Sequence, residues 1–562
     1  MKKWISCLLI LLFLSPTAGC GLADVPPAVP PEESAEPEVT PEPTPAPRKG
    51  GELTVPLAAP DTFNPLLTQS RDVLNFLSLV FESPIAHDEN SRPKPSLVTG
   101  WEASPDGRIW VFHVRKDVKW HNGQALTGDD ILFTLQALQG GTLGSFFQKD
   151  IAGNANIVET GLKNGDPYTF FIRLAEPSCQ ILDMLTFPVL PKSVYQSSEF
   201  MLTGKGDFSM APVGTGPYRV DPAQPYDGSS LKLVRNESWW NGTPYIDSIL
   251  AKVYATNEEA RNAFHNGEID LVDTMVVYAN TYSDLNKITH YKYLTQNYEF
   301  LALNSDNPLF ADRNIRKAIA YAIDRKDIIS KVYLNNAETV DVPIPSNSWL
   351  YDSTYRIYDY DAERARKLLA DAGWADSDGD GVLDKTEGGQ KRDLTFTILT
   401  NSDNDFRRDA IDLIAEHLAL VGFRVQTELV GWEQLQNERM RNRQFDAILT
   451  GYYLDYVHDL RFAFHSAQIG TELNNFIGYR NPELDNLMDT AAKAYTEEDK
   501  RKAYQKIQEH LVNELPVISL YFRTGSLLAN NRVHGIDKVG ELGIYRNIKN
   551  WYLVDGAVDG AE

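Results

Sequence analysis

The chain has 562 residues, too many for a single hydrophobic core, so two or three domains are expected. Hydrophobic residues make up 43% of it and charged residues 23%, which is typical of a globular protein. The formal net charge of -23 argues against nucleic-acid binding and against an electrostatic hold on an anionic membrane. The same charge fits simple solubility and, more weakly, a preference for cationic solutes.

Residues 1–20 have the features of a secretory signal peptide. Two lysines supply a charged start, and Leu8–Leu14 is an apolar run too short to span a bilayer. The tripeptide Ala-Gly-Cys that ends at Cys20 resembles a lipobox, the motif whose cysteine receives a lipid. We therefore expect a lipoprotein signal peptide with lipidation at Cys20. Thr17 replaces the leucine usual in that motif, so ordinary secretion is the alternative.

Residues 21–48 form a linker rich in proline and glutamate. Nine prolines lie between Pro26 and Pro47, with five glutamates among them and almost no large apolar residue. Such a segment cannot bury a core and favours extended polyproline, so we expect a disordered tether that reaches roughly 80 Å. A long tether after a lipidated cysteine suits the outer face of a Gram-positive cell membrane, and a periplasmic location is the alternative.

The stretch Pro95–Leu135 carries the most specific pattern in the chain. Ile109–Val114 alternates as a strand does, Val118–Gly123 suggests a second strand with its turn, and Thr127 has the position of a helix N-cap. In order, the stretch contains W-E-x-S-x-D-G, F-H-x-R-x-x-V-x-W-H-x-G and L-T-x-x-D. These motifs resemble the signature of the family 5 extracellular solute-binding proteins of ABC transporters, which include oligopeptide- and dipeptide-binding proteins.

Two further segments precede the middle of the chain. Gly214–Tyr218, G-T-G-P-Y, is similar to another hallmark of that family. It lacks the third glycine of a dinucleotide-binding loop and predicts a tight turn between lobes. Trp239 and Trp240 follow a strand pattern. They are interpreted either as part of the ligand site or as a strand end packed on a subdomain.

The rest of the chain is organised around Phe300–Ile329. An apolar run, a polar loop and apolar residues at helical spacing predict a strand, a loop and an amphipathic helix. The string resembles the family's passage from the first lobe into the second. The resemblance implies an α/β, two-lobed, periplasmic-binding-protein-like (type II) fold with an extra subdomain in the first lobe. The expected boundaries are 49–80, 207–295 and 520–562 for the lobe I core, 81–206 for the extra subdomain and 296–519 for lobe II.

In the second lobe, strand and helix patterns alternate. Leu394–Leu399 and Phe423–Leu429 are predicted strands, and Glu363–Ala372, Arg407–Leu420 and Glu497–Leu515 are predicted helices. This alternation predicts a largely parallel sheet covered by helices.

One stretch matches a twelve-residue calcium-binding loop position by position. It reads DSDGDGVLDKTE, with carboxylates at positions 1, 3, 5, 9 and 12 and glycine at position 6. The predicted ligands are Asp376, Asp378, Asp380, the carbonyl of Val382, Asp384 and Glu387. A polar surface hairpin is the alternative, because Asp and Gly are common turn residues. The loop lies in an insertion away from the cleft, so a bound calcium ion would be structural.

Motifs of catalysis are missing from the sequence. It contains no H-E-x-x-H, no G-x-S-x-G, no Walker A pattern and no cysteine pairs at zinc spacing. The protein is therefore not expected to be an enzyme or to need a cofactor for activity. A surface-anchored hydrolase stays as a distant third hypothesis.

The predicted ligand contact follows the strand pattern Phe445–Leu449. The next residues, T-G-Y-Y-L-D-Y, resemble the family's G-W-x-x-D-Y element. In peptide-binding members its Asp receives the α-ammonium group of the peptide and its aromatic residue lines the cleft. Asp455 matches that Asp, Tyr452 replaces the Trp, and Tyr453 lies beside it. The alternative is that Asp455 caps the following turn.

The resemblance thus implies a lipid-anchored, monomeric substrate-binding protein of an ABC importer. It would capture peptides in an interlobe cleft and deliver them to the transmembrane subunits of the permease. A receptor for an oligosaccharide or a metal chelate is the alternative within the same family.

Overall fold

The computed structural model describes residues 46–141, 143–148, 151–152, 156–196, 211–275, 287–454, 459–470, 474–541 and 543–554. The chain divides into Met1–Ala46 and Pro47–Glu562, and the architecture below is that of the second unit. Two large hydrophobic cores organise this unit. We name the part around the core that includes Leu53 and Trp551 lobe I, and the part around the core that includes Leu303 and Ile398 lobe II.

A four-stranded sheet forms the centre of lobe I. Its strands, in spatial order, are β1 (Glu52–Ala58), β10 (Ser248–Tyr254), β9 (Ser230–Arg235) and β8 (Tyr218–Val220). β1 runs parallel to β10, and the other neighbours are antiparallel. Leu53, Val55 and Leu57 are buried in alternation with half-buried residues, so one face of β1 enters the core. The helices next to this sheet are α1 (Arg71–Leu77) and α6 (Asn257–His265).

The extra subdomain contains a second sheet that is antiparallel throughout. Its strands, in spatial order, are β4 (Val98–Ala103), β5 (Ile109–Val114), β7 (Thr169–Leu174) and β6 (Ile157–Leu162). Helix α2 (Gly128–Gln139) packs against β6 and β7 and begins at the predicted N-cap, where Thr127 and Asp130 form a capping box. The smaller elements are β2 (Ile85–His87), β3 (Pro93–Pro95), α3 (Gln180–Met184) and α4 (Lys192–Tyr195). Except for β3, these elements contribute to the core of lobe I.

Two sequence predictions in lobe I are wrong. The segment 118–123 is no strand of a sheet, because it only closes a small hairpin through the isolated bridge between Lys119 and Ala125. The turn that starts at Gly214 does not lie between the lobes: it packs within lobe I, where the backbone N–H of His121 donates to the carbonyl of Gly214. A Cβ atom at Gly214 would lie 1.8 Å from the carbonyl oxygen of Val80, so only glycine allows this close approach.

Lobe II is built on a seven-stranded sheet. Its strands, in spatial order, are β11 (Leu271–Thr274), β19 (Val517–Asn530), β12 (Ile288–Leu303), β18 (Ala447–Tyr453), β16 (Thr395–Asn401) and β17 (Arg424–Val430), with β13 (Ala337–Thr339) beside β19. Only β18, β16 and β17 are parallel to one another. The prediction of a largely parallel sheet is therefore wrong for half of it, because β12 pairs antiparallel with both β18 and β19.

The helices of lobe II match the periodic segments of the sequence closely. The main ones are α7 (Arg313–Ala322), α8 (Arg325–Val332), α9 (Ala362–Asp371), α10 (Asp405–Ala419), α13 (Pro482–Lys493) and α14 (Glu497–Glu514). Shorter elements of the lobe include η5 (Pro308–Ala311), η7 (Leu435–Met440) and α12 (Arg461–Phe464). The helix predicted before Ile329 is in fact two helices, because the helical conformation breaks at Asp324, whose side chain caps the start of α8.

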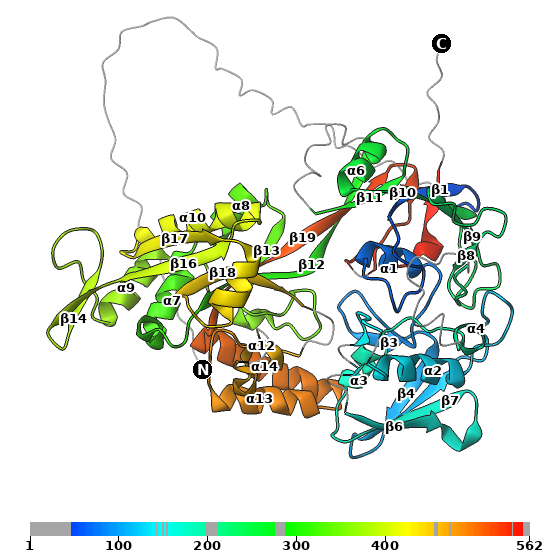
Figure 1. Ribbon diagram of the computed structural model, residues 1–562, viewed down its shortest axis with the longest axis horizontal. Helices are drawn as coiled ribbons and strands as arrows, with labels where there is room; N and C mark the ends of the chain where they lie inside the picture. Colours follow the sequence, from blue (N-terminus) through cyan, green and yellow to red (C-terminus); the bar gives the residue numbers. More distant parts are fainter. Residues whose placement is uncertain are drawn as a thin grey trace, which may run out of the picture. The chain divides into compact units, whose positions relative to one another are not determined.

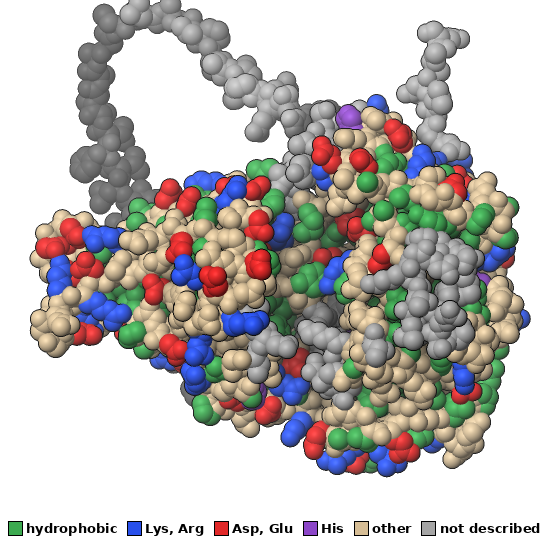
Figure 2. Space-filling view, viewed as in Figure 1, with side chains coloured by type: hydrophobic (Ala, Val, Ile, Leu, Met, Phe, Trp, Pro, Cys, Tyr) green, Lys and Arg blue, Asp and Glu red, His purple; other side chains and the backbone are tan. Residues whose placement is uncertain are grey.

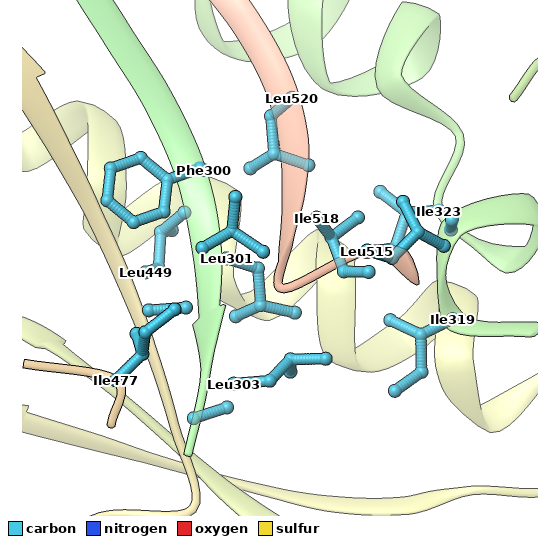
Figure 3. Packing of buried hydrophobic residues seen from close by; sticks show 14 of the residues in the cluster. Phe300, Leu301, Leu303, Ile319, Ile323, Leu449, Ile477, Leu515, Ile518 and Leu520 are labelled. Carbon is cyan, nitrogen blue, oxygen red and sulfur yellow. The ribbon is translucent and has the colours of Figure 1, made fainter. Parts of the chain in front are cut away.

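Two long strands, β12 and β19, run side by side from one lobe to the other (Figure 1). Tyr293 of β12 belongs to the core of lobe I, whereas Tyr298 belongs to the core of lobe II. The register of β12 against β19 shifts between Leu294 and Tyr298, so this irregularity lies where the strand leaves one core for the other. Figure 3 shows Leu301 and Leu303 of β12 packed with Ile518 of β19 and Ile319 of α7.

Candidate functional site

Figure 2 shows the surface hollowed between lobe I and lobe II. On the lobe II side, the end of β18 approaches lobe I, and the burial of the strand changes there. Ala447–Thr450 is buried, but Gly451, Tyr452 and Tyr453 are each half-buried. The end of β18 therefore emerges from the sheet at the predicted ligand element.

Tyr452 and Tyr453 have different surroundings, as expected for neighbours on a strand. The ring of Tyr452 packs against Phe300 at 4.9 Å and Phe462 at 5.1 Å between ring centres, inside lobe II. Tyr453 instead meets lobe I, because the guanidinium carbon of Arg71 lies 3.7 Å from its ring centre. Tyr453, rather than Tyr452, is the residue that faces the opposite wall.

A buried ion pair lies beneath Gly451. Arg407 donates to the two carboxylate oxygens of Glu299 at 2.8 and 3.2 Å, and the two side chains are 11% and 4% exposed. A Cβ atom at Gly451 would lie 2.8 Å from a guanidinium nitrogen of Arg407 and 2.6 Å from the carbonyl oxygen of Tyr298. Glycine at this position thus leaves room for the ion pair. The two charges of this pair neutralise each other next to the end of β18.

Glu541 connects the wall of lobe I to the crossing strand. Its carboxylate accepts a hydrogen bond of 2.7 Å from the backbone N–H of Gln296. Burial raises the pKa of Glu541, while that N–H, the Arg71 guanidinium, the hydroxyl of Tyr453 and Arg523 act in the opposite direction. The carboxylate therefore has partners from both lobes.

Two more carboxylates lie near Glu541 on the lobe I side. Asp273 accepts a hydrogen bond of 2.6 Å from the hydroxyl of Tyr293. Burial raises the pKa of Asp273 to about 7, and the charges of Asp72 and Glu541 add to this effect. Burial also raises the pKa of Asp72. Asp273 and Asp72 nevertheless keep exposed surface, a combination expected of groups that line a concave wall and face water.

Arg523 supplies a second positive charge near this wall, on β19. Its guanidinium carbon lies 5.0 Å from the ring centre of Phe406 and 5.8 Å from that of Tyr333. The hydroxyl of Tyr521 donates to that of Tyr333 at 3.2 Å. No local sequence pattern marks Arg71, Arg523, Asp273 or Glu541, because these residues meet only through tertiary structure.

The structure does not bring Trp239 and Trp240 together with Tyr452 and Tyr453. The two tryptophans line a separate cavity of about 400 Å³ whose walls all come from lobe I. Their indole N–H groups donate to the carboxylate of Glu82 at 3.2 and 3.1 Å. Burial raises the pKa of Glu82 to about 7, against the effect of these hydrogen bonds. The alternative interpretation, in which both rings pack at a subdomain boundary, matches this geometry.

The acidic loop brings part of the predicted calcium ligands together. Among the described residues, Asp376, Asp378 and Asp384 form the one group of three candidate ligands whose oxygens lie within 4.8 Å of one another. The ammonium group of Lys391 contacts Asp378 and lies 3.3 Å from Asp384, where it supplies positive charge.

The other predicted ligands of this loop point elsewhere. Asp380 pairs with Arg424 at 2.6 Å, and Glu387, in strand β14 (Asp384–Glu387), pairs with Lys385 at 2.7 Å. Val382 is buried, and its backbone N–H donates to Asp380. The donor set therefore fits a calcium ion in part: three carboxylates converge, and Lys391 competes for two of them.

Two predicted site residues lie outside the described residues. These are Asp455, which follows the end of β18, and Cys20. In the part of the chain that the structure describes, none of the helices has the length and hydrophobicity needed to cross a bilayer.

Comparison with known proteins identifies relatives over most of the chain. A family model described as "Bacterial extracellular solute-binding proteins, family 5 Middle" matches residues 92–468. The oligopeptide-binding protein AppA of Bacillus subtilis (strain 168) is 28% identical over 516 residues, which cover 90% of this chain and 92% of AppA.

Solved structures agree with this relationship. The structure of Bacillus subtilis AppA in complex with a nonapeptide has a TM-score of 0.63 and 26% identity, and the match covers 91% of this chain and all of that one (100%). NikZ of Campylobacter jejuni in complex with Ni(L-His) has a TM-score of 0.65 and 24% identity, with 90% and 100% of the two chains covered. At that identity the likeness to NikZ shows the fold alone.

Proposed function

Because the chain belongs to the bacterial extracellular solute-binding proteins of family 5, we propose that it captures peptides in the cleft between its lobes and delivers them to an ABC importer. The observation that carries the peptide assignment is the presence of both charges at the cleft. Arg71 and Arg523 lie close to Glu541, and Asp273 has Glu541 and Asp72 as neighbours. A peptide carries an ammonium group and a carboxylate, so it can pair with both kinds of group.

Pairing matters once the cleft closes over a solute and excludes water. An unpaired charge in a desolvated cleft costs several kcal/mol, roughly 3 or more when one partner of a buried pair is removed. Asp455 follows the end of β18 by two residues, close in sequence to Tyr453. We propose that it receives the α-ammonium group of the peptide. The half-buried ring of Tyr453 would then lie along the backbone of the bound peptide.

The test is direct identification of the solute. Native mass spectrometry of the purified full chain reports any molecule that it retains, and calorimetry then measures binding of that molecule. Peptides of two to nine residues, their N-acetylated forms, a nickel–histidine chelate and an oligosaccharide serve as comparison ligands. Binding of the chelate or the oligosaccharide, without peptide binding, would contradict the proposal. Cleavage of an added peptide pool would identify a hydrolase instead.

We also propose that the protein is held at the outer face of the cell membrane by a lipid on Cys20. The support is sequence: the charged start, the short apolar run and the Ala-Gly-Cys tripeptide. The Pro/Glu-rich residues 21–48 would act as the tether. The partners that follow are the transmembrane subunits of the permease.

A calcium ion in the loop 376–387 is a separate proposal. It is supported by the convergence of Asp376, Asp378 and Asp384. These oxygens would hold the ion if it displaced Lys391, and the ion would stabilise the insertion without a role in solute capture.

A further inference from the structure

The extra subdomain of lobe I touches lobe II at a second place, away from the crossing strands. The backbone N–H of Cys179 donates to the carbonyl of Ala494 at 2.8 Å, and that of Trp349 donates to Asn90 at 2.9 Å. The hydroxyl of Tyr495 donates to the carbonyl of Pro105 at 3.0 Å. Figure 1 shows α13 and α14 of lobe II next to α3 of the subdomain. The two lobes therefore also meet here, apart from the crossing strands and from the contact between Arg71 and Tyr453.

A buried charge network lies at the centre of this second contact. The ammonium of Lys500, on α14, donates to the carboxylate of Asp183, on α3, at 2.8 Å, and each side chain is 2% exposed. His87 of β2 lies 3.0 Å from the other oxygen of Asp183, and its side chain is 5% exposed. The ring of Trp349 lies 5.8 Å from the ammonium nitrogen. Opposite charges of two different lobes are thus removed from water together.

The energetics of such a pair are asymmetric. Burial would raise the pKa of Asp183, but Lys500 and His87 outweigh it and hold this pKa below its ordinary value. If the lobes part, both charges return to water, and hydration then compensates for most of the lost electrostatic attraction. If one partner is removed while the lobes stay together, the other charge remains buried and unpaired, which is strongly unfavourable. The pair therefore favours the joined lobes only while both members are present.

We propose that Lys500 and Asp183 are positioning residues for solute capture: they hold the two lobes together across the cleft without touching the solute. The role in solute capture rests on the proposed function, since holding the lobes together matters for capture only if a solute is enclosed. Its physical content, an equilibrium between joined and parted lobes that this pair biases, can be measured without any solute.

Cys179 provides a natural reporter of that equilibrium. It is 5% exposed, and burial raises the pKa of its thiol. Its side chain belongs to the edge of the lobe I core, but Lys500 and Glu497 of lobe II lie near the thiol and its backbone is bonded to lobe II. We therefore expect parting of the lobes to expose the thiol and make it more reactive. When opening and closing are fast relative to labelling, the labelling rate reports the fraction of open molecules.

The experiment measures N-ethylmaleimide labelling of Cys179 in the solute-free full chain, with peptide mass spectrometry to separate it from Cys7 and Cys20. Lys500→Met and Asp183→Asn should each accelerate labelling roughly tenfold or more. Lys502→Met is the matched control, because Lys502 pairs with Glu498 within α14 and is exposed. The double variant Lys500→Met/Asp183→Leu should return the rate toward that of the wild type, since an apolar pair leaves no buried charge.

Hydrogen exchange distinguishes the loss of an interlobe contact from a general loss of stability. Hydrogen exchange in β5 and β16, one strand in each lobe, should be unchanged in the single variants. Faster exchange in both strands, or single variants that label no faster than wild type, would overturn the proposal. So would a double variant that labels as fast as the single ones. Failure of all tested peptides to bind would refute the proposed function but would leave these labelling results standing.

Discussion

Arg71 of lobe I lies with its guanidinium carbon 3.7 Å from the ring centre of Tyr453 of lobe II. This cation–π contact joins the two walls of the cleft directly. The hydroxyl of the same tyrosine contacts Glu541 of lobe I, so the end of β18 meets the opposite lobe through two kinds of interaction. If Tyr453 also contacts the solute, as proposed above, then closure of the cleft and recognition of the solute involve the same residue.

Removal of this contact should weaken solute binding. We expect Arg71→Ala to reduce peptide affinity by about 1 kcal/mol, a usual value for a partly desolvated cation–π pair, as measured by isothermal titration calorimetry. Arg364→Ala is the matched control, because Arg364 lies 4.3 Å from the ring centre of Tyr321 within lobe II. Equal loss of affinity in both variants would show that the Arg71 contact has no special role.

The proposed role of Asp455 predicts a specific coupling. Asp455→Asn should reduce peptide affinity by on the order of 2 kcal/mol or more, with the melting temperature unchanged. Acetylation of the peptide amino end should weaken binding to wild type by a similar amount and have little effect on the variant. If acetylation costs the two proteins the same affinity, Asp455 does not hold the ammonium group.

The raised pKa of Asp273 predicts how stability depends on pH. Its folded pKa of about 7 exceeds the unfolded value of 3.8, so the folded state binds the extra proton between these values. Folding stability contributed by this group therefore falls as the pH rises from about 4 to about 7, and stays low above that.

Asp273→Asn should consequently raise the melting temperature at pH 8. The advantage should shrink as the pH falls from about 7 and vanish below about 4, where the wild-type carboxyl is neutral in both states. The amide can still accept the hydrogen bond from Tyr293. A gain in melting temperature that is the same at pH 8 and pH 4 would contradict this explanation.

Calcium should stabilise the protein if the loop 376–387 binds it. With an affinity near 10⁻³ M, 10 mM calcium should raise the melting temperature by about 1–2 °C relative to chelator. Asp384→Asn should abolish the shift, while Lys391→Met should enlarge it by removing the competing ammonium. Identical melting curves in chelator and in calcium, for both wild type and Lys391→Met, would exclude the site.

Attachment through Cys20 is tested in cells. Cys20→Ala should release the protein into the medium or leave it unprocessed. In the wild type, mass spectrometry should detect the added mass of a lipid on the N-terminal peptide. Membrane retention of Cys20→Ala equal to that of wild type would refute the lipid anchor. Cys179→Ala is the control, because Cys179 is buried in the folded unit.

Local elements could be predicted from sequence because their causes are local. Thr127 caps α2 through a residue three positions away, and the apolar spacing of 407–420 predicts a helix that the structure places at Asp405–Ala419. Predictions that depended on which strands pair with one another were less successful. Val118–Gly123 has a strand pattern but no strand beside it, and alternation of strands and helices could not reveal that β12 pairs antiparallel with β18.

The sequence by itself determined the family and the two-lobed α/β fold, and it predicted a ligand element after the strand that the structure shows as β18, because motifs and periodicity are properties of short stretches. Only the tertiary structure decided which side chains share the cleft. Arg71, Asp273, Tyr453 and Glu541 come from four distant segments, and they meet because β12 and β19 cross from one core to the other and fix the two walls. No pattern along the chain encodes such a meeting, since each residue is placed by the packing of a different element.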